Sequence, residues 1–242
     1  MDQLLSKTLA QIVNENHQAA SVFEKYGLDF CCKGKRSLQI ACDEKELSTT
    51  EVTSELESVI NKDVKPVVDF DNMSLTELAN YIVATHHGYV RQEVPLIFGY
   101  LQKIASKHGD RHPELHKIFE SFSAVKEELM SHMHKEEFVL FPRIAGLEKA
   151  KERYDSLSLG YLLGPVSMME HEHEHVGNLL EVIKLLSNNY TPPADACTTY
   201  RLVFAALKSF ETDLHQHIHL ENNILFPKTL KLFRQVKETA LN

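Results

Sequence analysis

Glycine, proline and strand-like alternation are scarce in this sequence. The 242 residues include nine glycines and eight prolines, and few runs alternate apolar with polar side chains. Apolar residues recur instead at spacings of three and four along most of the chain, which is the period of an amphipathic helix. The scarcity argues against a β-rich fold and predicts an all-α protein.

Long apolar runs and basic clusters are also missing. No stretch approaches the roughly 18 to 20 apolar residues that span a bilayer, and residues 1–4 lack the basic start of a secretory signal. Acidic residues outnumber basic ones by 34 to 26, which gives a net charge of −8, and the longest basic cluster is residues 33–36. These absences argue against nucleic acid or a membrane as partner and predict a cytoplasmic location.

Cysteine is sparse, and its spacing does not suit a disulfide framework. The four cysteines are Cys31, Cys32, Cys42 and Cys197. Two of them are adjacent, and a bridge between neighbours is strained because one peptide step is shorter than the usual Cα separation across a disulfide. Reduced thiols in a reducing compartment are the better interpretation.

The pattern divides the chain into three parts. Residues 1–61 predict a small helical domain, residues 62–73 a linker without helical periodicity, and residues 74–242 a bundle of long helices. Short helices are predicted in the first part at about residues 4–26, 37–43 and 50–61. Since about 60 residues are marginal for an independent core, we expect this domain to dock on another surface or to pair with its own copy as a homodimer.

Four long helices are predicted in the third part. A capping box at residues 74–77 opens the first, which continues to about residue 107 with a kink at Pro95. The others follow the turn at 108–113 to at least residue 142, run from residue 164 to a connection at 188–195, and run from about residue 196 past residue 227. Connections of this length favour an up-down-up-down four-helix bundle.

Fourteen histidines are the unusual feature of the composition. His132 and Glu136 are four residues apart and precede Leu-Phe-Pro, and His217 and Glu221 repeat the same arrangement. Residues i and i+4 lie on one face of a helix, so each pair can reach a common point. His87 and His173 stand in matching register on the other two helices. The repeat therefore indicates that the bundle consists of two copies of one helix pair.

This constellation predicts a metal site on the bundle axis. Two carboxylates can bridge two metal ions while the histidines fill terminal positions, and imidazole with carboxylate suits iron or manganese better than copper(I), with zinc left open. A lone helical histidine is usually a core or surface residue, but a duplicated pattern in register is not explained that way. The spacing differs from the Glu-x2-His of other dinuclear carboxylate bundles.

Helical faces help to choose among the histidines. His173 has apolar neighbours, whereas His171 and His175 lie on a more polar face. Register favours His87 over His86. The remaining histidines are read as solvated or as partners that orient ligands. We interpret Glu137, Glu170 and Glu172 as exposed charges, leave Glu93 as a side chain that could face the site, and expect Phe141 and Phe226 to be core residues.

The ligand pattern resembles hemerythrin-like domains. More narrowly, residues 164–170, 191–193, 196–199 and 220–223, and the run from Tyr26 to Cys32 followed by Gly34 and Lys35, look like the RIC (repair of iron centres) family. The resemblance covers nearly the whole chain. One departure is Lys33, which stands where the family often has glycine.

The resemblance implies a di-iron centre and a role in iron–sulfur cluster repair. Membership would mean restoring clusters damaged by nitric oxide or peroxide in client iron–sulfur proteins, with iron donation as the favoured mechanism. The implied ligands of the two iron ions are His87, His132, Glu136, His173, His217 and Glu221.

Alternative functions use the same residues. A nitric-oxide-binding, nitric-oxide-reducing or peroxidase-like enzyme would use the same ligands, so the sequence does not separate it from repair, although we lean toward a repair protein rather than an enzyme. An oxygen carrier usually has five histidines, and Glu221 departs from that set. A sensor would use residues 1–60 as its output.

Cys31 and Cys32 are the candidate residues for thiol chemistry. Nearby Lys33, Lys35 and Arg36 predict a lowered thiol pKa and a thiolate that relays electrons or passes iron or sulfide to a client. The alternative is a pair of partly buried residues at a helix corner. Cys42 and Cys197 are read as structural.

Overall fold

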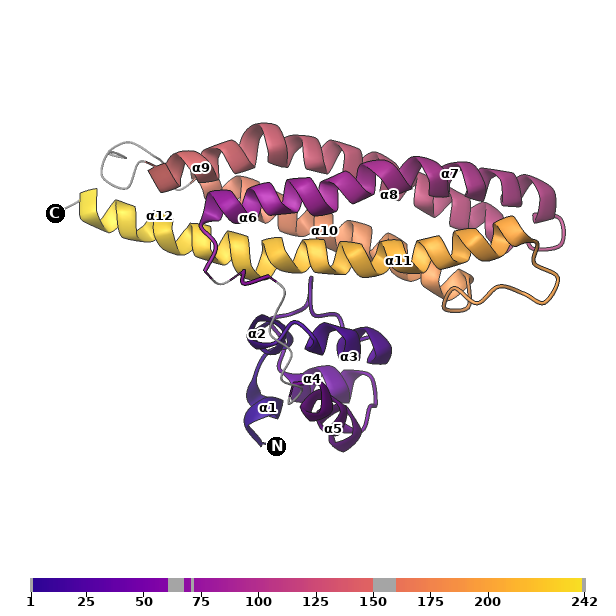
Figure 1. The fold of residues 1–242 in the computed structure, drawn as a ribbon, viewed down its shortest axis with the longest axis horizontal. Coiled ribbons are helices and arrows are strands. Elements are labelled where there is room, and N and C mark those ends of the chain that lie inside the picture. Colours follow the sequence, from indigo (N-terminus) through magenta and orange to yellow (C-terminus); the bar gives the residue numbers. More distant parts are fainter. Residues whose placement is uncertain (1, 61–67, 71, 150–159, 241–242) are drawn as a thin grey trace.

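The computed structural model describes residues 2–60, 68–70, 72–149 and 160–240, and these form helices joined by short connections (Figure 1). Within those ranges, the β-structure is limited to one antiparallel bridge between Thr8 and Ser37. The predicted all-α fold is confirmed.

Residues from 75 onward form a bundle of four long helices. Successive helices run in opposite directions (Figure 1), as the predicted up-down-up-down bundle requires. In chain order the segments are α6 (Leu75–Ile82), η1 (Val83–His87), α7 (Gly88–His108), α8 (Glu114–Lys135), η2 (Glu136–Leu140), α9 (Phe141–Lys149), α10 (Gly160–Leu186), α11 (Thr198–Leu220), η3 (Glu221–Leu225) and α12 (Phe226–Ala240).

Three of the long helices change to π-helix at a predicted ligand. The segment η1 ends at His87, while η2 begins at Glu136 and η3 begins at Glu221. Such segments are rare and often occur at functional sites. Helical periodicity does not distinguish these segments from α-helix, although the Leu-Phe-Pro sequence that ends two of them was a usable signal. Pro142 and Pro227 are the second residues of α9 and α12, and each follows a π-helical segment of the same continuous helix, where proline lacks the N–H group of a regular helical hydrogen bond.

The start of the bundle is fixed by its N-terminal cap. Ser74 Oγ accepts a hydrogen bond from the Glu77 N–H at 3.2 Å, and Glu77 Oε2 accepts one from the Ser74 N–H at 2.9 Å. This is the predicted capping box, which satisfies two otherwise unpaired donors. The helix then continues through Pro95 as α7.

The described residues of the small domain, 2–60, form five short helices, α1 (Asp2–Ser6), α2 (Leu9–Glu15), α3 (Ala19–Tyr26), α4 (Leu38–Glu44) and α5 (Thr49–Ile60). Gly27 ends α3 in the left-handed conformation, with φ of 63°. Gly34 closes the corner that carries the cysteine pair. A Cβ atom at residue 34 would lie 2.2 Å from the Phe30 carbonyl oxygen, so the corner has no room for a larger residue.

The small domain docks on the bundle beside η3 and α11 (Figure 1). Phe30 is 1% exposed and shares one hydrophobic core with Ile218 of α11. Burying a side chain of that size stabilises the structure by about 1.5–3 kcal/mol. Asn14 Nδ2 donates to the Asn223 carbonyl at 3.3 Å, and Lys35 pairs with Glu170 at 3.3 Å. The small domain therefore takes part of its core from the bundle.

Two predictions about organisation stay untested. Much of the predicted linker, residues 62–67 and 71, lies outside the described residues, so the division into 1–61, 62–73 and 74–242 remains a prediction. Pairing of two copies through the small domain is likewise a prediction. None of the described helices combines the length and apolar content needed to cross a bilayer.

Candidate metal centre

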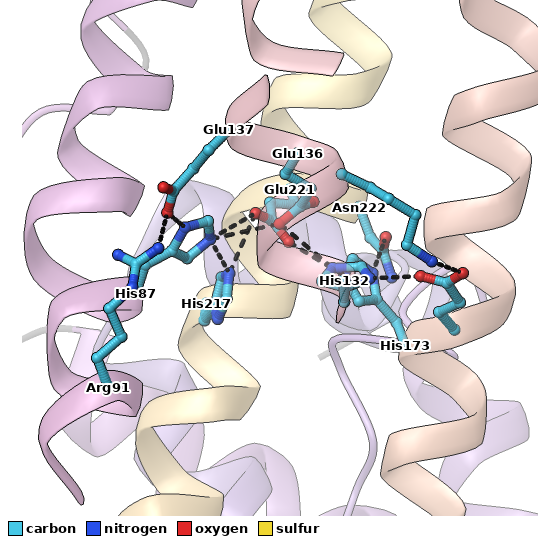
Figure 2. A network of polar contacts seen from close by, with 11 residues as sticks. His87, Arg91, His132, Glu136, Glu137, His173, His217, Glu221 and Asn222 are labelled. Carbon is cyan, nitrogen blue, oxygen red and sulfur yellow. Dashed lines mark hydrogen bonds and ion pairs between the residues drawn. The ribbon is translucent and has the colours of Figure 1, made fainter. Parts of the chain in front are cut away.

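Six side chains from all four long helices meet in the middle of the bundle (Figure 2). They are the six predicted ligands, and none is more than 2% exposed: His87, His132, Glu136, His173, His217 and Glu221. They lie between two hydrophobic cores, one including Leu129 and the other Leu140. The structure thus brings together every predicted metal ligand, whose role as ligands stays a proposal.

The six side chains form two groups of possible donors that share both glutamates. One histidine pair, His87 and His217, defines what we call the first position, and the other, His132 and His173, defines the second position. In each group the donor atoms lie within 4.8 Å of one another. Glu136 and Glu221 stand between the two pairs (Figure 2).

Distances in the two positions are similar. The Nε2 atoms are 3.2 Å apart between His87 and His217, and 2.9 Å apart between His132 and His173. Glu221 turns Oε1 toward His217 at 3.1 Å and Oε2 toward His173 at 3.1 Å. This carboxylate therefore spans both positions, as a bridging ligand must.

Glu136 approaches both positions through one oxygen. Its Oε2 atom lies 3.3 Å from His87 Nε2 and 3.3 Å from His132 Nε2. Both Glu136 oxygens, together with Oε2 of Glu221, are buried without a well-aligned hydrogen-bond donor among the described residues. Buried carboxylates are costly unless they are paired or bind a metal. These orphaned oxygens and the converging imidazoles fit a pair of cations.

Two of the histidines are held in place by carboxylates from neighbouring helices. His87 Nδ1 contacts Glu137 Oε1 at 2.6 Å, and His132 Nδ1 contacts Glu172 Oε2 at 2.9 Å. Arg91 pairs with Glu137 at 2.6 Å and Lys135 pairs with Glu172. Such contacts fix the ring orientation and leave Nε2 for a metal. The prediction that Glu137 and Glu172 are exposed charges is wrong, because both reach across to a histidine of another helix.

The other two histidines differ from each other. His173 Nδ1 contacts Asn222 Oδ1 at 2.9 Å. His217 Nδ1 is buried and has no hydrogen-bond partner among the residues that the structure describes. Its ring is stacked on His86, with centroids 5.6 Å apart and planes 9° apart. His86 itself contacts Asp213 Oδ1 at 3.1 Å, so it packs beside the site while His87 faces it.

The buried carboxylates and imidazoles of the site shift one another's pKa values. Burial opposes protonation of His132, but Glu136 and Glu172 outweigh it and raise the His132 pKa from 6.5 to about 10. For Glu221, burial by itself would raise the pKa, but His217 and His173 hold that pKa well below its usual range. The carboxylates are therefore ionised, and without a metal a proton on His132 balances part of their charge.

Comparisons with known proteins agree with this geometry. The Hemerythrin HHE cation binding domain matches residues 78–229, and ScdA_N, a domain of unknown function (DUF542), matches residues 5–60. The iron-sulfur cluster repair protein YtfE of Musicola paradisiaca (strain Ech703) is 36% identical over 228 residues, which cover 93% of this chain and 96% of that protein.

Further relatives carry the same name. The proteins of Enterobacter sp. (strain 638) and Escherichia coli O81 (strain ED1a) are each 36% identical, over 92% and 88% of this chain and over 96% and 91% of their own lengths. The chain belongs to the repair of iron centres family. The resemblance stated from the sequence is thereby confirmed, and its bundle is the family's hemerythrin-like domain.

In this family member the two phenylalanines after the glutamates cover the site. Phe141 stacks on His87 with centroids 5.9 Å apart, and Phe226 stacks on His173 with centroids 6.3 Å apart. Both are buried, as predicted for core residues. They shield the histidine rings from water, which strengthens electrostatic interactions within the site.

The cysteine pair of this family member lies at the interface of its two parts. Cys31 is buried and Cys32 is half-buried. The hydrogen bond to Cys32, burial and the charge of Asp29 raise the pKa of the Cys31 thiol. A lowered thiol pKa was predicted from the basic residues nearby, and for Cys31 this prediction is wrong. Lys35 pairs with Glu170 and Arg36 with Glu44, so both cations are engaged elsewhere.

His215 and His219 serve the interface between the small domain and the bundle. His215 Nδ1 contacts Glu24 Oε1 at 2.5 Å, and the His219 ring lies 5.5 Å from that of Phe30. Burial lowers the His219 pKa to about 4, so this ring is neutral at physiological pH. The sequence carries no local signal for this role, because the docking surface joins residues almost 200 positions apart. His171 and His175 are exposed, as predicted.

Proposed function

We propose that this chain is a di-iron protein that repairs iron–sulfur clusters damaged by nitrosative and oxidative stress, and that it acts by donating iron. Membership of the repair of iron centres family supports the repair role, because the relatives described above are named for it. The observation that carries the proposal is the pair of buried glutamates shared by two pairs of histidines.

Each residue of the centre has a definite role in this proposal. The four histidines would be terminal ligands of two iron ions, and Glu136 and Glu221 would bridge them. Imidazole and carboxylate ligands suit iron. Bound iron would supply one-electron redox chemistry. Two carboxylates leave part of the charge of two ferrous ions uncompensated, so this cage should hold its cargo less tightly than a carboxylate-rich one.

The expected clients are damaged iron–sulfur proteins in the cytoplasm. Nucleic acids are not expected as partners, because the net charge is −8 and the electrostatic attraction to phosphates depends on positive charge. A homodimer through the small domain remains part of this proposal.

The experiment follows labelled iron from this protein to a client. The protein is loaded anaerobically with 57Fe and mixed with an iron–sulfur enzyme whose cluster has been damaged by nitric oxide. The client is then separated, and its 57Fe content and activity are measured. The proposal predicts that label and activity appear together in the client. The His132→Ala, His217→Ala variant, supplied with the same amount of free ferrous iron, is the matched control.

Two results would contradict iron donation. One is recovery of client activity while the label stays with this protein. The other is equal recovery with the double variant and free iron. Repeated consumption of nitric oxide without loss of label would instead favour a nitric-oxide-reducing enzyme.

A further inference from the structure

A second cluster of metal-binding side chains lies at the corner of the small domain. Asp29, Cys31 and Cys32 place a carboxylate oxygen and two sulfur atoms within 4.8 Å of one another. The two Sγ atoms are 3.8 Å apart, and Cys31 Sγ lies 3.3 Å from Asp29 Oδ1. Neither cysteine is in a disulfide. The cluster shares no residue with the six buried side chains of the bundle.

The separation of the sulfur atoms suits a single tetrahedral cation. Two metal–sulfur bonds of about 2.3 Å at a tetrahedral angle place the sulfur atoms about 3.8 Å apart, which matches the distance between Cys31 and Cys32. Thiolates favour borderline and soft cations. The corner therefore has the donor types and the spacing of a small thiolate site.

The backbone holds Asp29 in place. Its Oδ1 atom accepts hydrogen bonds from the backbone N–H groups of Cys31, Cys32 and Lys33, at 3.2, 2.9 and 3.3 Å. Gly34, which has no room for a Cβ atom, fixes the turn that follows. The three donor side chains are thus positioned by a tight backbone turn. A preorganised turn lowers the entropy cost of binding an ion.

The thiols are accessible from two pockets. A pocket of about 320 Å³ and another of about 290 Å³ are both lined by Cys31, Cys32 and Glu174 of α10. The α10 backbone approaches closely here, because a Cβ atom at Gly177 would lie 3.8 Å from Cys32 Sγ. An ion at the thiols is therefore within reach of solvent and of a ligand presented by another protein.

One side chain joins this corner to the centre in the bundle. Asn222 Nδ2 donates to the Cys31 carbonyl at 3.5 Å, while its Oδ1 atom contacts His173 Nδ1 at 2.9 Å. Asn223 Nδ2 donates to the same carbonyl at 3.0 Å. The corner is thus anchored beside the second position of the bundle centre.

We propose that Asp29, Cys31 and Cys32 form a separate mononuclear site for a divalent cation of borderline or soft character, and that ferrous iron leaving the bundle occupies it on the way to a client. The binding site stands on the geometry alone, whereas the identity of its cargo rests on the proposed function. Binding converts two thiols to thiolates and releases two protons to solvent, so no oxidant or reductant is needed.

Cobalt(II) is a suitable probe because thiolate ligation gives it intense charge-transfer absorption. The full-length protein, with reduced iron in its bundle centre, is titrated anaerobically with cobalt(II). We expect thiolate absorption that saturates at one equivalent and is lost in the Cys31→Ser, Cys32→Ser variant. The Cys42→Ser, Cys197→Ser variant is the matched control and should keep it. Absence of the absorption in wild type, or its persistence in the Cys31→Ser, Cys32→Ser variant, would overturn the site.

The Asp29→Asn variant distinguishes the role of Asp29 as a metal ligand from its role in holding the backbone turn. The amide oxygen can still accept the three backbone hydrogen bonds, but the anionic ligand is gone. We expect the cobalt(II) affinity to fall about tenfold or more, with an unchanged circular dichroism spectrum. Unchanged affinity would contradict the three-ligand site.

The same variants distinguish this site from the proposed function. The His132→Ala, His217→Ala variant should bind cobalt(II) at the thiols as wild type does. Intact cobalt binding with failed iron donation would reject the proposed function and support the site. Intact donation by the Cys31→Ser, Cys32→Ser variant would overturn the passage of iron through the thiols.

Discussion

The two positions of the bundle centre have matching candidate ligands but different surroundings. Each has two histidines and the same two glutamates. In the second position both histidines are anchored at Nδ1, His132 by Glu172 and His173 by Asn222. In the first position Glu137 anchors His87, whereas His217 Nδ1 is unpartnered among the described side chains. A duplicated set of candidate ligands therefore does not give two equivalent positions.

Removing a shared carboxylate should have the largest effect on metal content, because both positions use the same two glutamates. Glu221→Gln takes one anionic ligand from both positions. We expect loss of both metal ions, measured by elemental analysis, with helical content retained by circular dichroism. Glu170→Gln, which changes an ion pair with Lys35 instead, should keep the metal of wild type. A Glu221→Gln protein with a full metal complement would disprove bridging.

The difference in anchoring predicts that the first position releases its metal first. An unanchored imidazole binds metal about 10- to 100-fold more weakly, and His217 has that character. Removal of iron by a chelator should therefore show a fast and a slow phase. His217→Ala should abolish the fast phase and His173→Ala the slow one. A single phase, or the reverse assignment, would show that anchoring does not decide release.

Weakening one anchor should reduce the difference between the positions. Glu172→Gln keeps the shape of the side chain but removes the charge that orients His132. We expect the slow phase of iron release to accelerate by about 10- to 100-fold, toward the rate of the fast phase. Glu137→Gln should instead act on the fast phase, through His87. Equal effects of both variants on both phases would argue against local control.

The smallest effect should come from pH, because a proton on His132 competes with a metal ion for the second position. In the metal-free protein the His132 pKa is raised to about 10, so this ring is protonated at neutral pH and must lose its proton to bind a cation. Affinity at the second position should rise with pH until about pH 10, by up to about tenfold per unit for one proton. Calorimetric titrations in buffers of different ionisation enthalpy measure the released proton. Metal uptake at pH 7 without proton release would contradict the assigned charge state.

The convergence of the six candidate ligands was predictable from sequence because it depends on local geometry. His132 with Glu136, and His217 with Glu221, follow from the spacing of residues on one helix face. The repeat supplied His87 and His173. The four-helix fold followed from the same periodicity, and the capping box at Ser74 was a local signal as well.

The surroundings of the ligands were not predictable in that way, because they come from other helices. Glu137, Glu172 and Asn222 each lie next to a ligand in sequence, yet each contacts a ligand of a different helix. Helical periodicity shows which residues share a face of one helix, but it does not show which residues of the neighbouring helix that face contacts. A carboxylate or amide directly beside a predicted ligand is the signal to look for.

The surface on which the small domain docks was not predictable from the sequence for a similar reason. Phe30 is buried against α11, and Cys31 faces Asp29 and Cys32. The sequence shows basic residues near the thiols, but only the fold shows that Lys35 turns to Glu170. Charge close in sequence is therefore a weak guide to the pKa of a buried thiol.

We propose that two metal ions share Glu136 and Glu221. Iron K-edge X-ray absorption on protein purified without oxygen can detect such a pair of ions. We expect nitrogen and oxygen ligands around each iron and a second iron atom less than about 4 Å away, and we expect the signal of this second iron to disappear in the Glu221→Gln variant. An iron environment without an iron neighbour, or one dominated by sulfur, would contradict this proposal.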